Sequence, residues 1–469
     1  MKKILSILAV LFICNSIFAQ VRTEYWSNKN KKSVGNYKDS LQDGKWTMWY
    51  ETGQKWCEGE FRQGERVGLW NYWFPSGKKL SQIHYDNGIN TVWFEDGKIE
   101  KTGKIVNGKL DSVWKTWHPN GKLHEITIYK NGLKEGKCIS FYADSTKEFI
   151  GIYKDDSLEG YATWWRKTGK KEMEGKSIRG KQDSIWVFYN ESGKVGSKGK
   201  FVKGLQDSIW NYWYDTGEKW KRGAFKMGKR EGLWTTWYES GQKEHEGMFA
   251  NGKETGMWTR WYANGKLKTT GAFKEGLMTG VWTGYYETGI KKYEVGYIPT
   301  TKKWLWRGYN IDRTKKDSLD LKYENATLTN IKHGNSTNWY ESGKLMNKGK
   351  YKNGELSGKW TAWYITGILE EQGSYKNDKK SGDWTFYDNH GVKFKKQRFS
   401  NGIADGPWVT YFSNGNKESQ GANIKGYKEG KWIFWDDKGK LVYMVEYKKG
   451  KKISEFPKPK VDVPVKKDN

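Results

Sequence analysis

Residues 232–243 have the sequence Gly-Leu-Trp-Thr-Thr-Trp-Tyr-Glu-Ser-Gly-Gln-Lys, and Gly-Met-Phe (247–249) and Asn-Gly-Lys (251–253) follow them closely. The run from Trp234 to Tyr238 is rich in aromatic and β-branched residues, which favour strands. The glycine-containing tetrads after each run are typical of tight turns, because glycine permits positive φ and short polar side chains bond the local backbone. This stretch therefore predicts a β-hairpin of two short strands and two turns.

The same pattern recurs along almost the whole chain. The step between repeats is 24 residues, except for 20 between Trp70 and Asn90 and 30 between Trp306 and Ser336. The longer step places an insertion within 312–332. The seventeen predicted repeats start at Trp46, Trp70, Asn90, Trp114, Cys138, Ala162, Trp186, Trp210, Trp234, Trp258, Trp282, Trp306, Ser336, Trp360, Trp384, Trp408 and Trp432.

Three residues after each start, the residue is aromatic in every predicted repeat. A hairpin alone is barely stable, so neighbouring hairpins must stack and align these aromatic side chains into rows. We therefore predict an all-β fold: an elongated, twisted array of about 17 tandem antiparallel β-hairpins that form an open repeat sheet. The tryptophans at this structural position are Trp49, Trp73, Trp93, Trp117, Trp165, Trp213, Trp237, Trp261, Trp339, Trp363 and Trp435.

Other repeat architectures fit the sequence poorly. Glycine turns every 11–13 residues leave no room for helices. Two repeats have the length of a propeller blade, but odd and even repeats do not differ. The chain has a net charge of +29 and few aliphatic residues, which is a composition typical of disorder, yet its 29 Trp, 29 Tyr and 18 Phe recur at fixed spacing. The predicted core is therefore aromatic.

The domain organisation follows from the repeat and from the two termini. Residues 1–19 are typical of a signal peptide cleaved after Ala19, because a basic start precedes a short apolar run. We therefore expect a periplasmic, outer-membrane-associated or secreted protein. The predicted divisions are a lead-in (20–34), a first array (35–299), a degenerate repeat with the insertion (300–335), a second array (336–453) and a disordered Pro/Lys-rich tail (454–469).

No group of residues in the sequence predicts catalysis, a cofactor or a metal site. The six histidines occupy different repeat positions, and none has cysteine or acidic partners at metal-ligand spacing. Asp-Ser pairs such as Asp183-Ser184 recur where short polar side chains bond the backbone. Cys57 and Cys138 lie four repeats apart, about 38 Å in a linear array, so we expect no disulfide between them.

Basic residues give the only candidate binding feature in the sequence. A lysine follows the first turn glycine in many repeats, and stacking would align these lysines along one edge. Such a row could attract an anionic lipid, glycan or polymer, or it could serve solubility and protect the sheet edges. The candidate row is Lys78, Lys98, Lys122, Lys170, Lys194, Lys266, Lys344 and Lys440.

The strings at 232–253 and 358–375 resemble the MORN repeat variant family, and the resemblance extends over roughly residues 35–450. It implies tandem antiparallel hairpins that contact protein or lipid, and it supplies no catalytic residues. Some bacterial proteins with such repeats are known as antitoxin components of toxin–antitoxin systems.

Three functions remain open at this point. The first is an exported, non-catalytic scaffold that binds protein partners in the cell envelope, and the second is a binder of anionic glycan, lipid or polymer. The third is an antitoxin-like neutraliser of a toxin. The sequence also leaves open whether the irregularity at 306–336 is a hinge, a break, a binding site or tolerated drift.

Overall fold

The computed structural model describes residues 20–302 and 327–456. The predicted signal peptide, Trp306 and residues 457–469 lie outside these ranges. The described residues form strands and turns without a helix, and accordingly no helix there is long and apolar enough to cross a membrane. They fall into an N-terminal part that ends at Gly217 and a C-terminal part that begins at Glu218.

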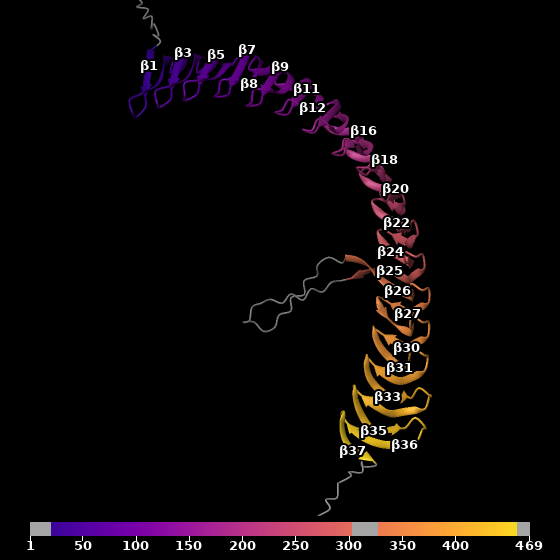
Figure 1. Ribbon diagram of the computed structural model, residues 1–469. Helices are drawn as coiled ribbons and strands as arrows, with labels where there is room; N and C mark the ends of the chain where they lie inside the picture. The colour runs from indigo at the N-terminus through magenta and orange to yellow at the C-terminus, as the bar shows by residue number, and fades with distance from the viewer. Residues whose placement is uncertain (1–19, 303–326, 457–469) are drawn as a thin grey trace, which may run out of the picture. The chain divides into compact units, whose positions relative to one another are not determined.

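The N-terminal part contains eighteen strands (Figure 1). They are β1 (Gln20–Tyr25), β2 (Lys31–Lys38), β3 (Leu41–Trp49), β4 (Lys55–Arg62), β5 (Glu65–Trp73), β6 (Lys79–His84), β7 (Gly88–Trp93), β8 (Ile99–Val106), β9 (Lys109–Trp117), β10 (Leu123–Lys130), β11 (Leu133–Phe141), β12 (Lys147–Lys154), β13 (Ser157–Leu158), β14 (Gly160–Trp165), β15 (Lys171–Ile178), β16 (Lys181–Tyr189), β17 (Val195–Val202) and β18 (Leu205–Trp213).

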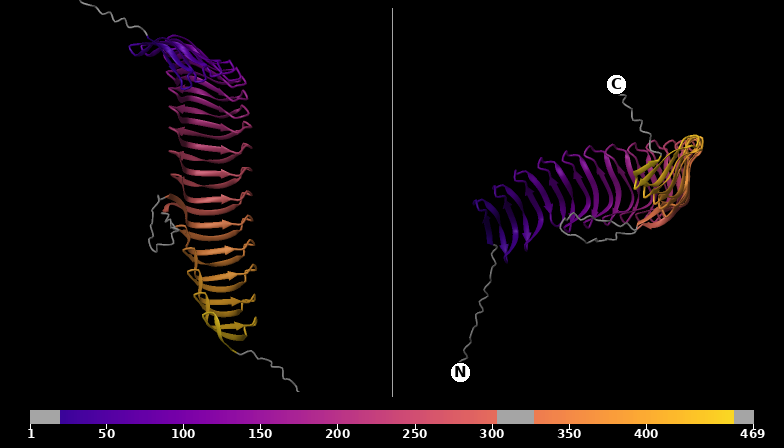
Figure 2. Two further views of the ribbon diagram at one scale, coloured as in Figure 1. Left: turned by 90° about the vertical axis from the view of Figure 1, so that its left-hand side faces the viewer. Right: turned by 90° about the horizontal axis from the view of Figure 1, so that it is seen from below.

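The C-terminal part contains nineteen strands, which lie side by side in the order of the chain (Figure 2). They are β19 (Lys219–Lys226), β20 (Lys229–Trp237), β21 (Lys243–Ala250), β22 (Lys253–Trp261), β23 (Leu267–Lys274), β24 (Leu277–Tyr285), β25 (Lys291–Lys302), β26 (Thr327–Trp339), β27 (Leu345–Lys352), β28 (Glu355–Leu356), β29 (Gly358–Trp363), β30 (Leu369–Lys376), β31 (Lys379–Tyr387), β32 (Lys393–Ser400), β33 (Ile403–Tyr411), β34 (Lys417–Ile424), β35 (Tyr427–Trp435), β36 (Leu441–Lys448) and β37 (Lys451–Phe456).

The predicted fold class is confirmed. Within each part, neighbouring strands pair antiparallel, and the short strands β13 and β28 pair only with the strand before them. The sheet does not close: β1 pairs with β2, and β37 pairs with β36. The two-residue turn at Lys203-Gly204 has φ of 52° and 86°, which is the positive-φ pair that matches the twist of a hairpin. Tandem hairpins thus form an open sheet in each part.

The core of a repeat is a tryptophan lying flat on a glycine of the preceding strand. Trp186 is 2% exposed, pairs in register with Gly175, and donates its Nε1–H to the Lys176 carbonyl over 2.9 Å. A Cβ atom on Gly175 would lie 2.3 Å from the Trp186 ring, so only glycine fits beneath it. The edge of the Phe201 ring closes one side. The first aromatic position therefore forms the core, with a glycine eleven residues earlier as its counterpart.

Side chains alternate across a strand, so each sheet has two different faces. The buried tryptophans define one face, which we call the Trp face. The residue before each of these tryptophans and the aromatic residue three positions after it point to the opposite face. This division places Ile185 and Tyr189 on the opposite face, and Trp186 and Phe188 on the Trp face.

The array begins one repeat earlier than the sequence pattern indicated. Residues 20–34, the predicted lead-in, form β1 and the start of β2. Trp26 donates its Nε1–H to the Trp49 carbonyl. In the next repeat, Tyr50 stands at the equivalent position and donates its hydroxyl to the Trp73 carbonyl. The pattern missed this repeat because Arg22 stands at the first aromatic position. At the other end, β37 extends to Phe456, so residues 454–456 of the predicted tail belong to a strand.

The predicted repeat start at Trp306 lies outside the described residues, within which the repeat of Ser336 directly follows that of Trp282 in the sheet. Strands β25 and β26 pair from Tyr293 to Lys302, and the Tyr286 hydroxyl donates to the carbonyl of Trp339. Other tyrosines at this position reach a carbonyl 23 residues ahead, whereas Tyr286 reaches one 53 residues ahead. Pro299 stands where other repeats have a turn residue of positive φ, and its ring fixes φ near −65°. The hairpin therefore continues outward beyond the usual turn (Figure 1).

The extended hairpin of β25 and β26 leads to a direct prediction. We expect that deleting residues 301–330, with Pro299→Asn and Thr300→Gly, restores an ordinary two-residue turn and leaves the fold intact. Circular dichroism and amide hydrogen exchange of β24 and β27 should match the parent chain. Loss of protection in both strands would show that the extended hairpin is needed for the array.

Candidate protein-binding surface

The predicted lysine row lies along the first turns, and all eight side chains are exposed. The ammonium groups mostly donate to backbone carbonyls in the corresponding turn of the next repeat. The Nζ atoms of Lys194 and Lys266, for example, lie 2.8 Å from the carbonyl oxygens of Thr216 and Thr288. The same contact is made by Lys98, Lys122, Lys170 and Lys344. Lys78 makes no such bond among the described residues, and the position of a corresponding turn after Lys440 lies outside them. Six of the eight lysines thus connect one turn to the next.

The aromatic row on the opposite face is covered by a second set of lysines. A lysine of one repeat places its Nζ over the aromatic ring of the next, as Lys147 does over Trp165 at 6.0 Å and Lys393 over Tyr411 at 3.9 Å. Equivalent contacts join Lys55 to Trp73, Lys79 to Trp93, Lys171 to Tyr189, Lys243 to Trp261, Lys291 to Trp339 and Lys417 to Trp435. These rings therefore help to join neighbouring repeats, and a lysine occupies the face that a ligand would stack on.

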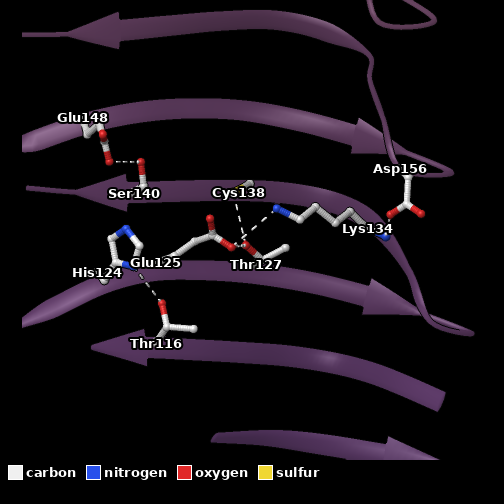
Figure 3. A network of polar contacts seen from close by, with 9 residues as sticks. All are labelled: Thr116, His124, Glu125, Thr127, Lys134, Cys138, Ser140, Glu148 and Asp156. Carbon is white, nitrogen blue, oxygen red and sulfur yellow. Dashed lines mark hydrogen bonds and ion pairs between the residues drawn. The ribbon is translucent and has the colours of Figure 1, made fainter. Parts of the chain in front are cut away.

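One repeat replaces the Trp–Gly core with polar side chains (Figure 3). Cys138 stands at the tryptophan position, and its Sγ lies 3.2 Å from the hydroxyl of Thr127, which replaces the glycine. The Thr127 hydroxyl also donates to Glu125, whose carboxylate lies 3.6 Å from the Lys134 ammonium. These residues cannot be grouped from the sequence alone, because they come from β10 and β11 and share no motif.

The chemistry available to this cluster is limited by burial. Cys138 is 2% exposed, and burial raises the pKa of its thiol. A thiol with a raised pKa is a poor nucleophile, because the thiolate is the reactive form. Within residues 20–302 and 327–456, no three His, Cys, Asp or Glu side chains are placed to hold a metal ion.

Cys57 should behave in the same way. It is free and 0% exposed, and burial raises the pKa of its thiol from 9 to about 11. The protonated thiol therefore contributes stability in full below pH 9, and this contribution is lost as the pH rises toward 11. We expect a thiol reagent to leave Cys57 unmodified in the folded chain at pH 8 and to modify it rapidly in denaturant, as read by peptide mass mapping. Fast native labelling at pH 8 would contradict this burial.

The surface that the other rows leave free is a line of exposed apolar side chains on the opposite face. They occupy the position directly before the first aromatic residue, where the neighbouring tryptophan points to the other side. Tyr161, Ile185 and Ile209 are 57%, 49% and 49% exposed. We call this set in the N-terminal part the N-terminal apolar row: Leu69, Ile89, Val113, Tyr161, Ile185 and Ile209. The exposed Lys137 interrupts the row between Val113 and Tyr161.

Lysines flank this row on the adjacent strands. Lys104, Lys176 and Lys200 are the register partners of Ile89, Tyr161 and Ile185, and all three lysines are exposed. Their ammonium groups make no hydrogen bond or ion pair within the part of the chain that the structure describes. Each lysine also has an aspartate as its register partner on the other neighbouring strand: Asp111, Asp183 and Asp207, respectively. The row therefore combines apolar side chains with lysines that can donate hydrogen bonds.

The C-terminal part begins with the same pattern and then loses it. Leu233, Met257 and Val281 are 53%, 62% and 63% exposed at the equivalent position. The repeats after the extended hairpin instead have polar residues or proline there: Asn335, Lys359, Asp383, Pro407 and Lys431. In the N-terminal part this position is polar only at Lys45 and Lys137, whereas it is polar or proline in every repeat after the extended hairpin. The two stretches therefore provide a contrast within one chain.

The sequence contained a signal for this row. An apolar residue directly before a core tryptophan cannot share its face, so its recurrence in consecutive repeats indicates an exposed line. This signal lies in residues outside the aromatic and glycine positions that define the repeat.

An open sheet of tandem hairpins with an aromatic core on one face defines a tandem-repeat scaffold. The sequence model of the MORN repeat variant family matches seven stretches of this chain, so the chain contains repeats of that family. The matched residues are 42–63, 66–87, 110–131, 230–251, 254–275, 332–353 and 428–449. Each match covers one hairpin.

No curated protein matches the sequence. Among solved structures, the chain aligns with the crystal structure of TcdB2-TccC3-TEV and with the Photorhabdus luminescens Tc holotoxin pore. In both cases the identity is 11% and the TM-score 0.14, and the alignment covers 91% of this chain and 26% of that chain. The chain thus spans about a quarter of their length.

Proposed function

We propose that this protein is a non-catalytic repeat scaffold that binds a protein partner through the N-terminal apolar row. The observation that carries the proposal is the row itself, in which six apolar side chains lie exposed on one face of the sheet. Contiguous exposed apolar surface is costly to keep in water and is typical of interaction sites. The backbone beneath the row is already paired, so a partner would be held by side chains.

The second candidate, an anionic glycan, lipid or polymer held by the turn lysines, has less support. Six of those eight ammonium groups already donate to carbonyls of the next repeat. The antitoxin-like function is a special case of protein binding in which the partner is a toxin. Location in the cell envelope rests on the sequence of residues 1–19.

The test is capture from envelope extracts with three forms of residues 20–469, each at low and moderate salt. The row variant carries Tyr161→Lys, Ile185→Lys and Ile209→Lys, and the matched turn variant carries Lys122→Gln, Lys170→Gln and Lys194→Gln. We expect the parent and the turn variant to retain the same protein at both salt concentrations, and the row variant to lose it. Retention by the row variant, with loss in the turn variant and at moderate salt, would favour the anionic ligand instead.

A further inference from the structure

The spacing of the N-terminal apolar row restricts what can lie along it. Each repeat contributes two strands, and strands lie roughly 4.8 Å apart, so successive row members are about 9.6 Å apart. The row runs across the strands, as the order of β14, β16 and β18 shows for Tyr161, Ile185 and Ile209. A partner segment lying along the row must present apolar side chains at this spacing.

The three regular backbone conformations differ in how well they meet this demand. A β-strand turns alternate residues to opposite sides, so its same-side spacings are about 6.8 or 13.6 Å. An α-helix repeats every seven residues at about 10.5 Å, which is about 0.9 Å too long per repeat. A polyproline II segment has three residues per turn and rises about 9.3 Å per turn, which is within about 0.3 Å. Over four repeats the mismatch between an α-helix and the row adds up to about 3.6 Å. For a polyproline II segment the mismatch adds up to only about 1.2 Å, so its apolar side chains stay opposite the row members.

Charge beside the row indicates the rest of the partner's composition. Lys176 and Lys200 lie next to Tyr161 and Ile185 in the sheet, and neither ammonium group has a hydrogen-bond or ion-pair partner among the described residues. These groups can donate to acidic side chains and to the unpaired carbonyls of a polyproline II backbone, which has no internal hydrogen bonds. Strand addition is not available at β14–β17, since each of these strands is paired on both sides.

We propose that the N-terminal apolar row binds a proline-rich, acidic segment of a partner protein in the polyproline II conformation, with an apolar residue at every third position. This inference rests on the proposed function and adds the chemistry of the partner. Tyr161, Ile185 and Ile209 contact the apolar positions, while Lys176 and Lys200 contact the acidic residues between them.

The test uses synthetic peptides and the full chain. The probe is a labelled peptide of about 15 residues made of Ile-Pro-Glu triplets, which spans about five repeats. One control has the same composition with isoleucine at every second or fourth position, and another is an acidic helical peptide with leucine at every seventh position. We expect fluorescence anisotropy to show binding of the triplet peptide at least ten-fold tighter than either control.

Two variants connect the binding to the row. Ile185→Lys with Ile209→Lys should weaken binding of the triplet peptide at least ten-fold, and Lys176→Glu with Lys200→Glu should weaken it and abolish its salt dependence. The matched control, Lys359→Glu, changes the equivalent position in a repeat after the extended hairpin, and it should leave binding unchanged. Equal binding of the helical peptide, or undiminished binding by the row variant with retained circular dichroism, would overturn the inference. Since extract capture does not depend on these peptides, the proposed function can stand even if the inference fails.

Discussion

Replacing Gly199 by alanine should destabilise the array around β17 and β18 by about 3 kcal/mol or more. The added Cβ would lie 2.2 Å from the ring of Trp210, which is 1% exposed and donates its Nε1–H to the Lys200 carbonyl. A methyl group cannot be accommodated there, so the indole must leave its site and lose both burial and its hydrogen bond. Amide hydrogen exchange of the two strands measures the effect locally, which matters because repeat arrays do not unfold in one step.

Gly196 provides the control on the same strand. A Cβ there would meet its nearest neighbour at 3.5 Å, which is an ordinary contact. Gly196→Ala should therefore change protection little. A double-mutant cycle adds a second check: Gly199→Ala should cost little once Trp210 is already alanine. Additive costs would show that the glycine and the tryptophan act independently.

Truncating Trp384 to alanine should cost about 3–5 kcal/mol, whereas the same change at Trp408 should cost less than half as much. Trp384 is fully buried over Gly373, and the ammonium group of Lys380 lies 3.9 Å from its ring centroid. Trp408 pairs in register with Gln397 rather than glycine and remains partly exposed. The buried glutamine takes the space in which the indole would lie.

The comparison is read from hydrogen exchange of β31 and β33 in the two variants. A third variant, Gln397→Gly, opens the site beneath Trp408 and should increase protection of β33. Equal losses of protection in the two tryptophan variants would mean that burial on the Trp face does not determine how much each tryptophan contributes to stability.

The sequence predicted the hairpins well because turn glycines and aromatic residues are local signals that recur at a fixed step. It did not reveal the pairing of Gly175 with Trp186, because the two residues belong to neighbouring repeats and each position was considered within its own repeat. Pro299 is a second case in which the sequence did not reveal a contact between repeats. Its effect on the turn is local, but the consequence, a direct contact between the repeats of Trp282 and Ser336, becomes visible only through strand pairing.

The binding surface was harder to predict than the fold. The turn lysines drew attention because charge is visible in the sequence, yet contacts such as Lys194 to the Thr216 carbonyl depend on how turns stack. Ile185 is an exposed apolar residue, and the alternation beside the buried Trp186 explains why. In a sheet with a core on one face, the face of a side chain decides its role.

Photo-crosslinking from one row position tests most directly whether the N-terminal apolar row binds the partner. A benzoylphenylalanine placed at Ile185 should give a single dominant crosslinked protein in envelope extracts, and the same probe at Lys359, the equivalent position in a repeat without an apolar residue, should not. Crosslinking of that protein from Lys359 but not from Ile185 would contradict the assignment of the row as the binding surface.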